Sequence, residues 1–66
     1  MNAVRETRSQ RGITQERLAE LTGVARQSII SIEKGRFLPT IETALRMAEA
    51  LHVAVEDLFW LTDEKK

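Results

Sequence analysis

Apolar residues recur three and four positions apart along most of this chain, a spacing that favours amphipathic helices over strands. The pattern predicts a first helix from about Asn2 to Gln10. Asn2 is its candidate N-cap, Gly12 is a stop signal just beyond its end, and its apolar face is thin, with only Ala3 and Val4.

Two further short helices are predicted on either side of a glycine turn. Thr14 is a candidate N-cap for a helix from Gln15 to Leu21, and Gly23 marks the turn that follows. The next helix runs from about Arg26 to Lys34 and ends at Gly35. The residues predicted to face the core are Leu18, Ala19, Leu21, Ile29 and Ile32.

The second half of the chain predicts an extended loop and two more helices. Pro39 disfavours helix at the residue before it, and Thr40 is a good N-cap for a helix from Ile41 to Leu51. A short fifth helix is expected from Val55 to about Phe59. The predicted inward residues of these two helices are Ile41, Ala44, Leu45, Ala48, Leu51, Val55, Leu58 and Phe59.

Composition narrows the class of protein. The 66 residues suffice for one small domain, and the absence of cysteine together with a single histidine leaves no disulfide and no metal site. No apolar run is long enough for a transmembrane helix, so we expect a soluble, cytoplasmic protein of bacterial type. The net charge of zero is the sum of +3 over residues 1–39 and −3 over residues 40–66. This uneven distribution weakly favours a protein whose N-terminal half faces DNA.

The stretch from Thr14 to Gly35 has the physical design of a helix-turn-helix. Small Ala19 allows the second helix to cross closely, and Gly23 permits a backbone conformation that a side chain would resist. Val24 and Ile29 can fill the angle between the two helices. The sequence therefore predicts a DNA-binding unit over residues 14–35, whose recognition helix covers about residues 26–34.

The chain closely resembles the lambda-repressor-like (Xre/Cro) family of regulators. The resemblance rests on Gln15 with Leu18-Ala19, Gly23-Val24, Ile32-Glu33-Lys34-Gly35, Pro39 before a helix, and Val53 before Glu56-Asp57-Leu58-Phe59. It implies an all-α, five-helix domain and a sequence-specific transcriptional regulator, which we expect to be a repressor. It also implies a homodimer that binds a palindromic operator in double-stranded DNA, with half-sites about one helical turn apart.

The resemblance assigns base reading to the recognition helix. Arg26, Gln27 and Ser31 fall where the family contacts base edges, and Ile30 falls where some relatives touch DNA. Arginine can pair with guanine and glutamine with adenine, whereas serine discriminates weakly. The alternative for Arg26 and Gln27 is a solvated helix end. Candidate phosphate ligands are Gln15, Ser28, Lys34 and Arg36, with Arg11 a weaker one.

The resemblance also implies a structural pair. An arginine of the first helix reaches the glutamate that ends the recognition helix, so we expect a partly buried salt bridge between Arg8 and Glu33. Two residues depart from the family. Ala25 stands where a Ser or Thr commonly caps the recognition helix, and Thr7 stands near a frequent leucine. Both departures predict a less stable domain.

The segment 58–66 is expected to form the dimer contact, with a short strand after the fifth helix. We expect Leu58, Trp60 and Leu61 to form its centre, with Phe37 and Leu38 as secondary contacts. The alternative is that Trp60 folds back on its own domain.

Other functions fit the residues less well. An antitoxin that binds a toxin or another protein partner would use the same fold, and a restriction-modification controller is a variant of the regulator hypothesis. No catalytic residues are assigned, because Ser28 and Ser31 lack a nearby histidine, while His52 and Glu56-Asp57 suit helix ends. We expect no enzyme activity, no cofactor and no small-molecule ligand.

Overall fold

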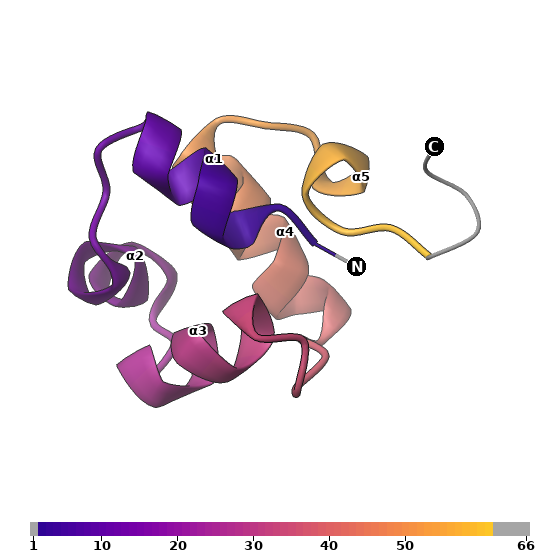
Figure 1. The fold of residues 1–66 in the computed structure, drawn as a ribbon, viewed down its shortest axis with the longest axis horizontal. Helices are drawn as coiled ribbons and strands as arrows, with labels where there is room; N and C mark the ends of the chain where they lie inside the picture. Colours follow the sequence, from indigo (N-terminus) through magenta and orange to yellow (C-terminus); the bar gives the residue numbers. More distant parts are fainter. Residues whose placement is uncertain (1, 62–66) are drawn as a thin grey trace.

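The computed structural model describes residues 2–61, and five helices pack around one core within that span (Figure 1). They are α1 (Val4–Gln10), α2 (Gln15–Thr22), α3 (Arg26–Glu33), α4 (Ile41–Leu51) and α5 (Val55–Leu58). The predicted all-α, five-helix fold is confirmed. Helix α2 packs against α3 and α4, α1 contacts α3, and α5 contacts α4. None of these helices is long and apolar enough to cross a membrane.

Local capping signals fix the boundaries of α2 and α4. The Thr14 hydroxyl accepts a hydrogen bond from the Arg17 backbone N–H at 3.0 Å, and the Thr40 hydroxyl accepts one from Thr43 at 3.2 Å. Gly23 ends α2 in the left-handed region with φ 71°. These predicted caps are confirmed, and α2 ends one residue later than expected.

The first helix begins at Val4 rather than at Asn2. Asn2 instead forms an isolated antiparallel bridge with Phe59, and the Ala3 backbone N–H donates to the Leu58 carbonyl at 2.9 Å. This pairing holds residues 2 and 3 out of the helix, and α5 ends at Leu58 with Phe59 in an extended conformation. Asn2 still assists the helix start, because its side-chain oxygen accepts from the Val4 N–H at 3.2 Å.

The core combines residues from all five helices. Its fully or almost fully buried apolar residues are Val4, Leu18, Ile29, Ile32, Met47, Ala48, Leu51 and Leu58. The prediction that Leu58 lies at a dimer surface is therefore wrong, since packing of α5 on α4 turns it inward.

Three other predicted core residues lie on the surface. Leu21 is half-exposed, and the neighbouring Thr22 is buried with its hydroxyl donating to the Leu18 carbonyl at 2.7 Å. Ile41 and Leu45 are mostly exposed, because α4 is rotated so that Met47, Ala48 and Leu51 face the other helices. The unbranched Met47 side chain, absent from the predicted stripe, fills the interior instead.

Candidate nucleic-acid interface

Helices α2 and α3 are joined by a tight turn at residues 23–25. Gly23 supplies the positive φ, and Val24 is partly buried against the core. Ala25 adopts the extended conformation of an N-cap, with φ −61° and ψ 143°, but its side chain makes no capping hydrogen bond. The N-terminal end of α3 therefore presents backbone N–H groups that no side chain of residue 25 satisfies.

Helix α3 has one buried side and one open side. Each residue turns the helix by about 100°, so Ile29 and Ile32 fix the buried direction. Gln27 and Lys34 project almost opposite to it and are exposed. Ser28 lies nearer the buried side and is partly covered. The structure thus brings all the predicted base-reading residues to one open face: Arg26, Gln27, Ile30 and Ser31.

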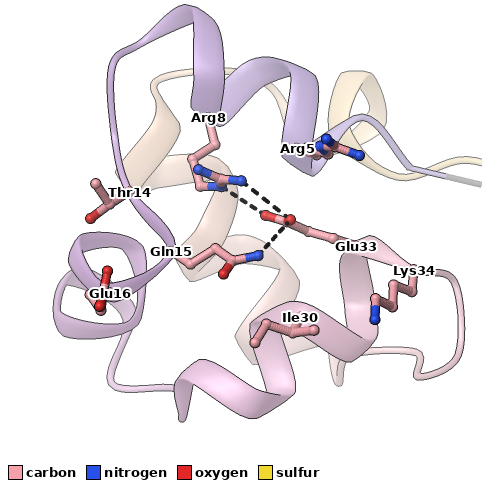
Figure 2. A pocket seen from close by; sticks show the side chains of 8 residues that line it. All are labelled: Arg5, Arg8, Thr14, Gln15, Glu16, Ile30, Glu33 and Lys34. Atoms are coloured by element: carbon pink, nitrogen blue, oxygen red, sulfur yellow. Dashed lines mark hydrogen bonds and ion pairs between the residues drawn. The ribbon is translucent and has the colours of Figure 1, made fainter.

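The carboxylate of Glu33 is the centre of a hydrogen-bonded cluster that joins three helices (Figure 2). Its Oε2 accepts from Arg8 Nε at 2.8 Å, and its Oε1 accepts from Arg8 Nη2 at 3.4 Å and from Gln15 Nε2 at 3.1 Å. The Arg8 and Glu33 side chains are only 14% and 5% exposed. The predicted contact between Arg8 and Glu33 is present, and it includes Gln15 as a third member.

Gln15 was predicted as a phosphate ligand rather than as a partner of Glu33. Its amide nitrogen carries two hydrogens, and the bond to Glu33 uses one of them. The second hydrogen remains available for another acceptor, so the bond to Glu33 does not contradict the predicted phosphate contact, which stays a prediction.

An open groove of about 500 Å³ lies between α1, α2 and α3, and the Glu33 cluster forms part of its lining (Figure 2). Figure 2 shows Arg5 and Lys34 on the side of the groove opposite Thr14 and Glu16. Both Arg5 and Lys34 are exposed. Sequence reasoning missed Arg5, although it lies three residues before Arg8 and therefore on the same side of α1. One flank of the groove therefore carries two exposed cations.

The other predicted cations are placed differently. Arg11 donates from Nε to the Leu51 carbonyl at 2.8 Å, so its guanidinium caps α4 and the prediction of a phosphate contact is not supported. Arg26 lies 3.8 Å from Glu16, and both side chains are largely exposed, so this weak pair leaves Arg26 able to turn toward DNA. Arg36 is exposed in the loop after α3.

Only some of the residues predicted to form the dimer contact are exposed. Leu61 and Phe37 are exposed, whereas Trp60 is partly buried within its own chain. A small groove of about 260 Å³ runs between the loop at residues 37–39 and Phe59. The rest of the predicted dimerisation segment, residues 62–66, lies outside the described residues.

Comparison with known proteins identifies the class. A family model described as helix-turn-helix matches residues 4–58, and the chain belongs to this Xre/lambda-repressor-like family of DNA-binding domains. The chain is a transcriptional regulator with a helix-turn-helix DNA-binding domain, and the family is one of regulators rather than enzymes.

Among curated relatives, the chain is 43% identical over 63 residues to the uncharacterized HTH-type transcriptional regulator YgzD of Bacillus subtilis, covering 96% of each chain. It is 48% identical to an uncharacterized HTH-type transcriptional regulator of Methanothermobacter thermautotrophicus, covering 92% of this chain and 90% of the relative. Among solved structures it is similar to the restriction-modification controller protein C.AhdI from Aeromonas hydrophila, with a TM-score of 0.80, 34% identity and 85% of each chain covered.

Proposed function

We propose that this protein acts as a homodimer that binds a palindromic operator through the major groove and represses transcription. The observation that carries the proposal is the open face of α3, which gathers polar side chains suited to base edges beside a groove that has the exposed Arg5 and Lys34 on one flank. Repression requires only that the bound protein occupy a promoter. Such a regulator acts where the chromosome lies, in the cytoplasm.

Base reading is assigned to the first turn of α3 and the turn after it. Arg26 can bond bidentately to guanine and Gln27 to adenine, and each such pair gives about 1–3 kcal/mol of discrimination. Ser31 contributes a weaker polar contact. Ile30 is partly buried and can touch a thymine methyl group.

Phosphate contacts are assigned to the two flanks of this face. Gln15 serves one flank from the start of α2, and Lys34 and Arg36 serve the other. Arg5 joins them because it is exposed beside the groove that Lys34 also lines. Ser28 is the weakest candidate, since it faces partly toward the core. These contacts fix the register of α3 and add little sequence preference.

The dimer surface is proposed around the loop after α3 and the chain's C-terminal segment. Large exposed apolar side chains occur in this loop, in the first half of α4 and in the C-terminal segment, with exposed fractions of 51% for Phe37, 84% for Leu38, 81% for Ile41, 52% for Leu45 and 69% for Leu61. The groove between residues 37–39 and Phe59 links the loop to the C-terminal segment. Apolar side chains exposed next to one another, as Phe37 and Leu38 are along this groove, often mark an interaction surface.

A second copy is the occupant that fits this surface. The surface carries apolar side chains on both sides of the groove, so it can pack against itself about a two-fold axis. The described domain measures 31 × 21 × 19 Å. Half-sites one DNA turn apart lie about 34 Å from each other, so two domains of this size would sit next to one another on the DNA.

Selection of bound duplexes from a random library tests the DNA-binding part of the proposal. We expect enrichment of two inverted half-sites with centres about 10–11 base pairs apart. A single unrepeated site would argue against the dimer, and a lack of enrichment would overturn sequence-specific binding.

Sedimentation measurements test the dimer surface. The double substitution Leu38→Ser with Ile41→Ser should yield monomers at concentrations where the wild type is dimeric. Leu21→Ser is the matched control, because this exposed leucine lies beside Arg46 and Ala50 on a different side of α4. A double variant as dimeric as the wild type would place the interface elsewhere.

A restriction-modification controller is a narrower version of the same function. The similarity to C.AhdI favours it, because 85% of each chain superposes. A genomic neighbour that encodes a methyltransferase or endonuclease would support this version, and a neighbouring small toxin gene would support an antitoxin instead.

A further inference from the structure

Asn2 makes contacts with three parts of the fold that are far apart in the sequence. Its side-chain Nδ2 donates to the carbonyl of Ile32 in the last turn of α3 at 2.9 Å. Its Oδ1 accepts from the Val4 N–H at the start of α1. Its backbone forms the antiparallel bridge with Phe59, just after α5. The residue is partly buried, so these bonds are only partly exposed to water.

These bonds connect the recognition helix to the C-terminal segment. The Ile32 carbonyl accepts from both Asn2 and the Gly35 backbone N–H, which lies 3.0 Å away, so Asn2 joins the hydrogen bonding that ends α3. The neighbouring Ala3 N–H donates to the Leu58 carbonyl at 2.9 Å. Asn2 and Ala3 therefore connect residues 58–59 to the end of α3, so a displacement of residues 58–59 would also move the end of α3.

We propose that Asn2 is a positioning residue that couples the pose of α3 to the segment at residues 58–61, so that DNA binding and assembly at that segment reinforce each other. This inference rests on the proposed function, since the segment 58–61 borders the proposed dimer surface. Asn2 lies outside the helix-turn-helix and contacts the last turn of α3, whereas Arg26 and Gln27 lie in its first turn.

Asn2→Ser is the informative variant. Serine keeps a short acceptor for the Val4 N–H and adds no charge, but its side chain is too short to reach the Ile32 carbonyl. The probe is a duplex with one half of the sequence that the wild-type protein selects, so that only one protomer contacts the DNA, and it is used at protein concentrations at which sedimentation shows the same oligomeric state for both proteins. We expect the affinity for this duplex to fall about fivefold to tenfold. This is the change in dissociation constant that corresponds to the net free energy of one ordinary hydrogen bond.

Val53→Ala is the matched control for stability. Val53 packs against the core in the turn after α4, away from α3, so its truncation should lower the melting temperature and leave half-site affinity unchanged. All affinities are measured well below the melting temperatures. Equal affinity for Asn2→Ser and the wild type would overturn the positioning role, as would an equal loss in Val53→Ala.

Amide exchange tests the coupling itself. In the wild type, half-site DNA should slow exchange of the Ala3 amide, which is bonded to Leu58, and this slowing should be lost in Asn2→Ser. No slowing in the wild type, or the same slowing in both proteins, would overturn the coupling.

The free protein separates failure of this inference from failure of the proposed function. If no DNA sequence is selected, the proposed function fails, but Asn2→Ser should still speed exchange of the Gly35 amide, which shares the Ile32 carbonyl. The Gly23 amide, bonded to Ala19, should be unaffected. Equal changes at both glycines would show a general loss of stability and overturn the role of Asn2.

Discussion

Glu33→Ala removes the acceptor that joins α1, α2 and α3. In the native protein the carboxylate accepts two hydrogen bonds from Arg8 and one from Gln15. The substitution leaves the Arg8 guanidinium, which is 14% exposed, with the Ile13 carbonyl as its remaining bonded partner in this cluster. Breaking a buried ion pair from one side costs about 3–5 kcal/mol, and the residual exposure of Arg8 argues for the lower end, about 3 kcal/mol.

That loss is large for a domain of this size. A 66-residue chain has a free energy of unfolding of about 3–10 kcal/mol, and each kcal/mol shifts the melting temperature by about 4–8 °C. We therefore expect Glu33→Ala to melt about 12–24 °C lower, as followed by helical circular dichroism. DNA affinity, measured where the variant is still folded, should also fall at least tenfold because α3 loses its hydrogen-bonded link to α1.

Two companion variants separate the ion pair from general loss of structure. Arg8→Met combined with Glu33→Leu should unfold with a higher free energy than Glu33→Ala, because no buried charge is left unpaired. Glu20→Ala removes the partner of Arg17 from an exposed pair and should change stability by about 0.5 kcal/mol or less. A Glu33→Ala variant within about 0.5 kcal/mol of the wild type would contradict the bracing role of the cluster.

Three further substitutions test separate features. Ala25→Ser should raise the free energy of unfolding by about 1 kcal/mol in urea denaturation, because residue 25 already has the backbone of an N-cap and lacks only the acceptor; no gain would mean that the hydroxyl does not reach α3. His52→Gly should stabilise the domain by about 1 kcal/mol, since His52 ends α4 with φ 59°, and a decrease would show that its side chain contributes a contact. Lys34→Ala should weaken binding to all DNA sequences alike, and it should reduce by about 1 the steepness with which the logarithm of affinity falls with the logarithm of salt concentration. An altered base preference would contradict a phosphate role.

Local signals made much of the fold predictable. The signals at Thr14, Gly23 and Thr40 act on their own neighbours in sequence. Helices α2 and α4, whose ends these residues cap, begin where predicted. The pairing of Asn2 with Phe59 joins the two ends of the chain and has no local signature, which is why the start of α1 was misplaced. The inward face of α4 was likewise misjudged, because an apolar stripe that includes Ile41 does not reveal how the helix is rotated against its neighbours.

The sequence could predict the part of the candidate site that lies on a single helix, α3. The family resemblance grouped Arg26, Gln27 and Ser31, and helical spacing agrees for Gln27 and Ser31, which lie four residues apart on one side of α3. The contact between Arg8 and Glu33 was anticipated from the family resemblance. The participation of Gln15 in that cluster and the capping of α4 by Arg11 depend on how separate helices meet, which the sequence pattern does not specify.

Sequence selection by the wild type and by Gln27→Ala tests most directly whether the open face of α3 reads DNA. We expect both proteins to enrich the same symmetric site, with the preference lost in the variant at one base pair of each half-site and retained elsewhere. That result would place Gln27 on a base edge. An unchanged preference at every position would contradict base reading by Gln27 on the open face of α3.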